Sequence, residues 1–302
     1  MLEKIQHRQS LRRAELSHIN LCGARLDDGN FTQAYLRCAN LTGASCSGAD
    51  FSKATLILAV LSGASLEGAR LEAAELTRAR LNRGILRELY APKAKFHGAD
   101  LDESDLSFAT LIRADLSGST GRNTHFKNAN LTQTNLDAGD FSGASFGGAV
   151  LARSQWQGAT LQGTSFYLAD LEAANLIGAD LTGANLTQAD VLNAQFKAAC
   201  LEGAVLLQTQ ADWSTFDQAN LTTADLSQAS FYGSQLNNAT LAAANLTGTN
   251  LQAASLEGAD LTGATLIDAQ VSGALFTDVK GLTAAQARWL RSEGALTVPA
   301  VR

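Results

Sequence analysis

The feature that most constrains the fold of this 302-residue chain is a five-residue period that runs through almost all of it. Stepping by five from Leu11 to Phe276 gives 54 positions, of which 36 are Leu, 11 are Phe, two are Val and one is Trp. Two residues before these central positions, 38 residues are Ala and 13 are Gly, Ser or Thr. A period of five matches neither an α-helix nor a flat β-strand, since either would scatter the apolar residues around its surface. Each pentapeptide must therefore form one short side of a closed coil.

Blocks such as GASLEGARLEAAELTRARL (residues 63–81) and ADLTGANLTQADV (residues 179–191) resemble the pentapeptide-repeat family, whose pattern is A-(D/N)-L-x-x. The resemblance extends over nearly nine-tenths of the chain and is compatible with the long, largely uninterrupted solenoids common in cyanobacteria. It implies an all-β fold, a right-handed quadrilateral parallel β-helix of about 13 coils in which residues twenty apart stack. The central residue and the small residue two before it would face inward, where stacked Leu and Phe pack as a dry column. The other three positions would face solvent.

The period also predicts the boundaries of the parts of the chain. We expect an N-terminal cap segment over residues 1–10, a β-solenoid over residues 11–280, and a capping helix with a short tail over residues 281–302. Both ends of a solenoid need covers, because an open parallel edge invites association. Leu2 and Ile5 are the apolar residues expected to cover the first coil.

The C-terminal segment has the sequence signals of a short helix. Thr283 with Gln286 matches a capping box, in which each residue satisfies a backbone N–H of the other. Trp289 and Leu290 would supply an apolar face, and Gly294 suits the end of the helix. This helix is expected to cap the last coil.

Three places break the repeat without shifting its phase. Leu89 and Ala91 exchange a small and a large residue, and Pro92 is expected to remove an N–H from the ladder. Gly121 and Ala211 replace central residues. We expect distorted or bulged corners at these places rather than inserted domains.

The formal net charge is −6, which provides no basic footprint for nucleic acid. Its distribution is uneven. Residues 1–153 hold 18 Lys and Arg against 16 Asp and Glu, whereas residues 154–302 hold 5 against 13. The sequence therefore predicts no direct binding to nucleic acid.

The cysteines indicate a reducing compartment, and the hydropathy indicates a soluble chain. Four cysteines show neither the paired spacing of a zinc site nor a disulfide framework. No apolar run of 18 residues exists, and the first twenty residues are rich in charge. We expect a soluble, cytoplasmic protein without a membrane insertion. The four cysteines are Cys22, Cys38, Cys46 and Cys200.

One segment matches a catalytic sequence motif and another is rich in possible metal ligands, but the repeat explains both better. Gly143 to Gly147 match G-x-S-x-G around Ser145, but that motif requires a strand-to-helix turn with His and acid partners. An acidic cluster lies at outward positions and lacks the spacing of a cation-binding loop. The histidines form no metal-binding pair, so the sequence predicts no enzyme, no metal and no cofactor. The cluster contains Asp100, Asp102, Glu103 and Asp105.

Large apolar residues at outward positions are the candidate partner-binding residues, because these positions should be polar. Isolated surface hydrophobes are also common without any function. For each group, binding of another protein and formation of a homodimer are both open, since either would use an apolar centre edged by Arg. The first group is Ile57, Leu58 and Val60, with Arg37, Cys38, Arg78 and Arg80 one coil away, and the second is Tyr167, Leu168 and Leu207.

Two functions compete at this stage. The first is a protein-interaction scaffold or regulatory binding protein, whose partner the sequence does not identify. The second is a DNA mimic that binds a type II topoisomerase, as the resemblance implies for the quinolone-resistance branch and gyrase. DNA carries about one charge per 1.7 Å, and a net charge of −6 falls far below that density over about 13 coils. The sequence therefore favours the scaffold.

Overall fold

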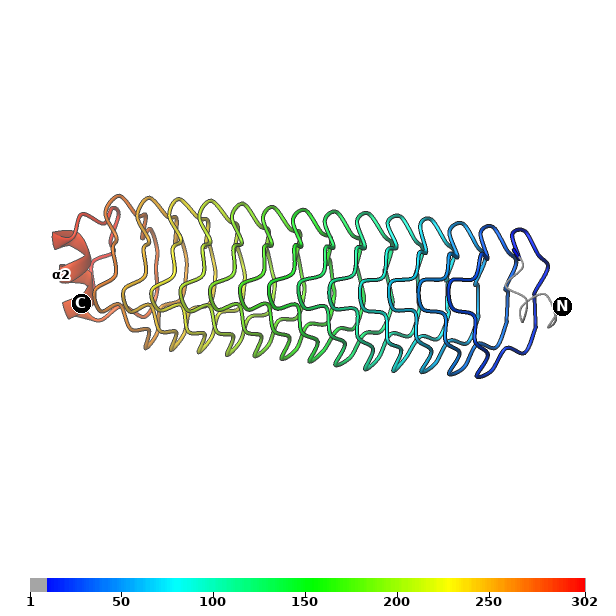
Figure 1. Ribbon diagram of the computed structural model, residues 1–302. Helices are drawn as coiled ribbons and strands as arrows, with labels where there is room; N and C mark the ends of the chain where they lie inside the picture. Colours follow the sequence, from blue (N-terminus) through cyan, green and yellow to red (C-terminus); the bar gives the residue numbers. More distant parts are fainter. Residues whose placement is uncertain (1–9, 302) are drawn as a thin grey trace. The chain divides into compact units, whose positions relative to one another are not determined.

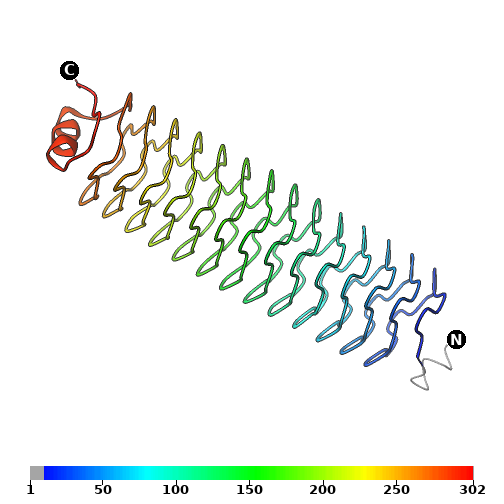
Figure 2. The same ribbon diagram turned by 90° about the horizontal axis from the view of Figure 1, so that it is seen from above.

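The computed structural model describes residues 10–301, so the predicted N-terminal cap residues Leu2 and Ile5 lie outside the described residues. The chain forms two compact units, Met1–Gln155 and Trp156–Arg302. Within each unit, successive coils of a right-handed quadrilateral β-helix lie side by side (Figures 1 and 2). Residues 11–155 supply 29 pentapeptides and residues 156–280 supply 25, with four in each coil. The predicted fold class is confirmed.

Parallel bridges join residues twenty apart, as the period predicts. They pair Glu15 with Tyr35 in the first unit and Asp180 with Cys200 in the second, for example. Each bridge is a single residue, so the sides of a coil are too short to form longer strands. The division into cap segment, solenoid and capping helix stays a prediction, because the solenoid residues themselves fall into two units.

A β-turn ends every pentapeptide and gives the coil its corners. The carbonyl oxygen of Leu11 accepts a hydrogen bond from the N–H of Ala14 at 2.9 Å, and Arg13 between them has a φ of 57°. The equivalent residue, two after the centre, has a positive φ in all 54 repeats, and 19 of these residues are Gly. A positive φ at this turn position only is the mark of a type II turn. Val and Ile are absent from these positions, where β-branched side chains are strained, and Thr223 is the one β-branched residue among the 54.

The backbone N–H groups of a repeat have four fixed partners and one variable partner. In residues 31–35, the first, third and fifth N–H groups bond to neighbouring coils, and the fourth closes the turn. The remaining N–H, that of Thr32, bonds to the side chain of Asn30 at 3.1 Å. This side-chain bond explains why Asn and Asp are common just before the centre.

The core consists of the central residues and the small residues two before them. Stacking twenty residues apart places aromatic rings face to face, as for Phe31 and Phe51 at 4.7 Å or Phe196 and Phe216 at 4.5 Å between ring centroids. Trp156 and all eleven central Phe residues are fully buried. The predicted dry column is therefore present within each unit.

The break at Pro92 is not the bulge that the sequence suggested. Pro92 occupies the position after the centre, where the N–H takes no part in the ladder, so proline removes nothing there. The flanking bonds are regular, with the N–H of Ala91 bonded to Thr110 at 2.8 Å. Leu89 and Ala91 are both fully buried, and the large side chain fills the small site while the small one occupies the large site. Parallel bridges continue through Tyr90.

The breaks at Gly121 and Ala211 are also regular corners, in contrast to the expectation. A Cβ on Gly121 would lie 2.6 Å from the ring of Phe141, so that ring occupies the space that a side chain would need. Ala211 is fully buried, and its N–H bonds to Ser230 at 2.7 Å. A neighbouring coil thus compensates for the missing volume at Gly121 without any change in the backbone.

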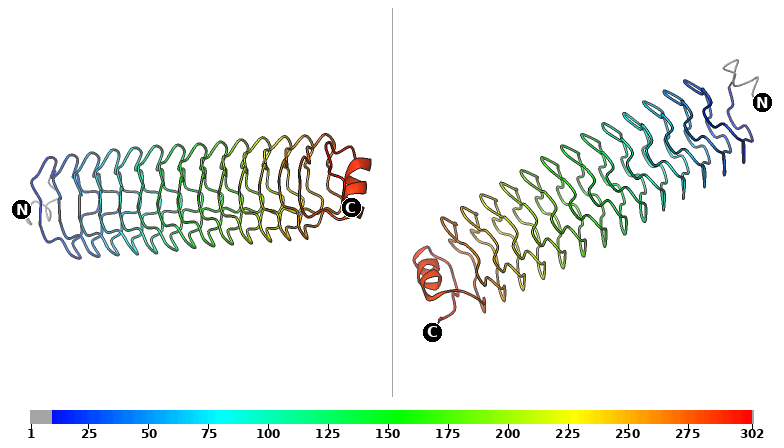
Figure 3. Two further views of the ribbon diagram at one scale, coloured as in Figure 1. Left: turned by 180° about the vertical axis from the view of Figure 1, so that it is seen from behind. Right: turned by 90° about the horizontal axis from the view of Figure 1, so that it is seen from below.

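The C-terminal helix α2 (Ala284–Ser292) is the only helix of the described residues and follows the last coil of the second unit (Figure 3). The predicted capping box is confirmed, because Thr283 accepts from the N–H of Gln286 and Gln286 accepts from the N–H of Thr283 at 2.9 Å. Gln286 also donates to the carbonyl oxygen of Ala264 at 3.0 Å, which fixes α2 to the coil. Among residues 10–301, no helix has the length and hydropathy needed to cross a membrane.

The chain returns to the last coil after α2, which the sequence did not reveal. Gly294 has a φ of 82° and allows the reversal, as expected for a helix end. Leu296 then pairs in parallel with Leu275 and accepts a hydrogen bond from the N–H of Phe276 at 3.0 Å. Leu290 is fully buried as predicted, whereas Trp289 is only half-buried. The cap therefore combines a helix with one added rung of the ladder.

Candidate functional site

The first candidate group lies on one corner of the first unit and the side that follows it. Ile57 and Leu58 form a β-turn, and Leu58 is 43% exposed with a φ of 58°. Val60 follows on the next side, where it bridges Asn40 and Arg80 on the adjacent coils. Ile57 and Val60 are half-buried. The three side chains form an apolar surface at positions that point away from the core, which we call the Ile57 patch.

Arginine side chains border the Ile57 patch on both adjacent coils. The N–H of Cys38 bonds to the carbonyl oxygen of Ile57 at 3.0 Å, so Arg37 lies one coil before the patch. Arg78 and Arg80 lie one coil after it. All three arginines are exposed, and none has an acidic partner within 4.0 Å among residues 10–301. The patch is therefore an apolar centre with unpaired cations at its edge.

The second candidate group is less continuous. Tyr167 and Leu168 occupy one turn and are 44% and 53% exposed. Leu207 lies at the same corner two coils farther on, with Thr187 between them, and is only half-buried. Beside Thr187, Gln188 donates to Gln208 at 2.8 Å and starts a polar ladder. The structure thus keeps Tyr167 with Leu168 but separates Leu207 from them.

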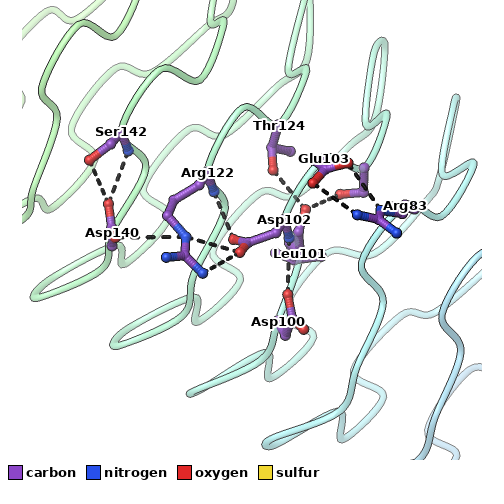
Figure 4. Close-up of polar contacts among 10 residues, drawn as sticks. Arg83, Asp100, Leu101, Asp102, Glu103, Arg122, Thr124, Asp140 and Ser142 are labelled. Carbon is purple, nitrogen blue, oxygen red and sulfur yellow. Dashed lines mark hydrogen bonds and ion pairs between the residues drawn. The ribbon is translucent and has the colours of Figure 1, made fainter.

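The acidic cluster does not form a cation site, because its members belong to different ion pairs and turns (Figure 4). Asp102 accepts from Arg122 at 2.6 Å, and Glu103 accepts from Arg83 at 3.0 Å. Asp105 lies 3.7 Å from Arg87. Asp100 accepts from the N–H of Asp102 within its turn, at 3.2 Å. Within residues 10–301, no three His, Cys, Asp or Glu side chains come together as metal ligands would.

The Asp102–Arg122 pair predicts a pH dependence of stability. Partial burial acts to raise the pKa of Asp102, but hydrogen bonds and the charge of Arg122 outweigh it and leave this pKa lowered. A lowered pKa contributes stability above the unfolded-state value and loses it as the pH falls through the folded-state value. We therefore expect R122Q to destabilise the protein in urea at pH 7, by about 1 kcal/mol or less for an exposed pair, and to have a smaller effect at about pH 2, where more of the Asp102 carboxyl is protonated.

A matched control for this prediction is R113Q. Arg113 donates to Gln133 at 2.7 Å across the same twenty-residue spacing, but its partner carries no charge. Its effect should therefore be the same at both pH values. An R122Q effect that does not change with pH would show that Asp102 contributes nothing through its charge.

Ser145 and the cysteines have ordinary structural surroundings. Ser145 bridges His125 in parallel, and Phe146 beside it is buried in the core, so the G-x-S-x-G letters belong to regular repeats. Cys46 replaces a central residue, and burial with a minor effect of the Asp27 charge raises its pKa to about 12. All four cysteines are free. A cytoplasmic location stays a prediction.

One surface feature escaped the sequence analysis. Trp213 is 57% exposed at a turn position, and Tyr232 on the next coil lies beside it with ring centroids 5.3 Å apart. Trp213 follows the break at Ala211 by two residues. The signal that could have identified it is Gly233, twenty residues later, since this glycine leaves the space that the indole ring occupies.

Comparison with known proteins identifies a repeat family over most of the chain. The family described as Pentapeptide repeats matches eight segments, at residues 14–45, 44–83, 69–107, 99–137, 140–176, 164–203, 204–241 and 241–278. HetL, a pentapeptide repeat protein involved in heterocyst differentiation regulation from the cyanobacterium Nostoc sp. strain PCC 7120, is 30% identical. The alignment covers 93% of this chain and 97% of HetL, with a TM-score of 0.22.

Two other solved structures share less sequence. QnrB1, a plasmid-mediated fluoroquinolone resistance protein, is 21% identical over 65% of this chain and 97% of its own, with a TM-score of 0.42. A pentapeptide repeat protein from the Arabidopsis thaliana thylakoid lumen is 24% identical over 54% of this chain and 83% of its own, with a TM-score of 0.19. No curated protein matches the chain.

Proposed function

The chain belongs to the pentapeptide repeat family, and from that premise we propose that it is a non-enzymatic protein-interaction scaffold or regulatory binding protein. The observation that carries this proposal is the Ile57 patch. Three apolar side chains stand together at outward positions that the repeat mostly fills with polar or small residues. The partner is another protein, and the contact requires no cofactor.

The physical support for this proposal is that the patch lowers the stability of the free protein. Leucine in a left-handed backbone conformation is disfavoured relative to glycine, which occupies 19 of the equivalent positions. Leu58 also leaves apolar surface in water. An apolar centre with a charged rim is the composition of a protein interface, where Arg is enriched. Binding of a partner would bury the centre and pair the arginines.

A DNA mimic that binds a type II topoisomerase is the alternative. A mimic needs negative charge that is dense along its surface. The charges weigh against it, because residues 1–153 hold 18 Lys and Arg against 16 Asp and Glu. The exposed Arg37, Arg78 and Arg80 around the patch have the sign opposite to that of a phosphate backbone.

The test is the double substitution Ile57→Glu, Leu58→Glu. Carboxylates buried against an apolar partner surface should weaken capture of the partner at least tenfold, about 1.4 kcal/mol or more. The thermal stability should barely change, since surface substitutions usually shift it by about 0.5 kcal/mol. The measurement is affinity purification from the source cells with quantitative mass spectrometry, together with a melting curve of each bait.

Two matched variants make the result specific. Ala242→Glu with Ala243→Glu adds the same charges at the same repeat positions and should capture the partner as the wild type does. Tyr167→Glu with Leu168→Glu tests the second group. If the Ile57 and Leu58 variant retains all partners at equal yield, the Ile57 patch is not the binding site. If the wild type is a dimer that this variant disrupts, the partner is a second copy of the chain.

A further inference from the structure

The side of the second unit that carries Trp213 combines an exposed aromatic corner with unbalanced negative charge. Trp213 has a φ of 58°, a backbone conformation that a bulky side chain disfavours. Its ring is 57% exposed, and the ring of Tyr232 meets it edge to face at an interplanar angle of 84°. The corner therefore presents a large aromatic surface to solvent at a position where glycine or alanine would be easier to accommodate.

The neighbouring coil provides a seat for the indole ring. A Cβ on Gly233 would lie 2.5 Å from the six-membered ring of Trp213, so any other residue there would displace the indole. Tyr232 is held by the carboxylate of Asp212, which accepts from its backbone N–H at 3.1 Å. The same carboxylate accepts from the hydroxyl of Ser230. Gly233 thus leaves room for the six-membered ring of Trp213, and Asp212 and Ser230 fix the coil that carries its aromatic neighbour Tyr232.

The charges on the side of the coil that ends at this corner all have one sign. The outward positions of the pentapeptides centred on Leu171, Val191, Ala211, Phe231, Leu251 and Val271 include four carboxylates and no Lys, Arg or His. None of the four has a cationic partner within 4.0 Å among the described residues. The three Asp residues among them accept from neutral groups, as Asp190 does from the N–H of Leu192 at 2.9 Å. The four carboxylates are Asp170, Glu172, Asp190 and Asp212.

We propose that this corner, which we call the Trp213 corner, binds an arginine-bearing segment of a protein partner. The planar guanidinium group stacks on the exposed part of the Trp213 side chain, because the negative face of an indole ring attracts a cation. The four carboxylates attract the remaining positive charge of the segment and speed its encounter. A lysine side chain carries the same charge but lacks the flat group that stacks. The proposal is independent of the Ile57 patch, which lies in the other unit.

The test uses blocked ten-residue peptides in which glycine alternates with arginine, with lysine or with citrulline, the neutral analogue of arginine. Binding to the full-length protein is measured by fluorescence anisotropy of a labelled peptide. We expect the arginine peptide to bind more tightly than the lysine peptide, and the citrulline peptide to show no binding. Trp213→Ala should weaken binding of the arginine peptide about tenfold, as a desolvated cation–π contact predicts.

The variants should fold normally, so that a loss of peptide binding cannot result from a folding defect. Alanine already occupies the equivalent corner position at Ala173 and Ala253, so Trp213→Ala should fold normally. The matched control is Phe108→Ala, which removes an exposed aromatic residue from the same turn position in the first unit. It should bind the arginine peptide as the wild type does. Wild-type affinity in Trp213→Ala, an equal loss in Phe108→Ala, or no binding to the wild type would each overturn the proposal.

Discussion

Replacing Leu181 by Asp should destabilise the second unit by several kcal/mol, because it buries an unpaired carboxylate in the dry column. Leu181 is fully buried, and its N–H bonds to Cys200 on the next coil at 2.7 Å. The new side chain would lie between the fully buried central residues Leu161 and Leu201 of the adjacent coils. Urea unfolding followed by circular dichroism measures the change.

The control for Leu181→Asp is Leu168→Asp, which makes the same chemical change at a position that is 53% exposed. Aspartate tolerates the left-handed backbone of that turn, so the stability should remain close to that of the wild type. Equal stability of Leu181→Asp and the wild type would contradict the inward register of the central positions.

Deleting residues 282–302 should expose the last coil and cause association. The deletion removes the buried Leu290 and the rung at Leu296, and thus uncovers Phe276 and the parallel edge of the ladder. Exposure of one buried Phe costs about 1.5–3 kcal/mol, and an open edge is a template for pairing with another chain. Light scattering should show oligomers, and hydrogen exchange should show fraying that begins near the last coil.

The control for the cap deletion is a chain that lacks only residues 300–302, which keeps α2 and Leu296 in place. It should remain as stable as the full chain and show no added association. If the chain without residues 282–302 is equally stable and does not associate, the segment has another role, such as contact with a partner.

The fold was predictable from the sequence because several positions of each pentapeptide indicate the same structure. The central Leu and Phe residues, the small residues before them, and the Asn or Asp at the bridge all indicate one register, and stacking twenty residues apart follows. The capping box of Thr283 and Gln286 was equally legible, since it depends on residues three apart.

The three breaks in the repeat were wrongly predicted to be distorted or bulged corners. Their regular structure depends on backbone hydrogen bonds and on side chains of neighbouring coils. Pro92 leaves the ladder intact because the residue directly after a central residue donates no backbone hydrogen bond to a neighbouring coil. The sequence alone does not show this. Gly121 is compensated by Phe141, a residue twenty positions later. The rung at Leu296 was missed for a similar reason, because Leu296 follows its partner Leu275 by twenty-one residues and so lies outside the five-residue phase.

The candidate surfaces were only partly predictable. Outward apolar residues could be located from the period, and Ile57, Leu58 and Val60 do lie together. Thr187 lies between Leu168 and Leu207 and could be read from the sequence. Whether it separates the members of the second group depends on how the coils stack. The Trp213 corner required knowledge of how the indole lies over Gly233.

The measurement that most directly tests the proposed function is photo-crosslinking in the source cells, with a photoreactive residue in place of Ile57. The same residue in place of Ala242, an equivalent turn position whose neighbour in the turn is the small Ala243, is the control. The account predicts a covalent adduct with a protein from the Ile57 position and none from the Ala242 position. No adduct at Ile57, the same adducts from both positions, or an adduct with nucleic acid would contradict it.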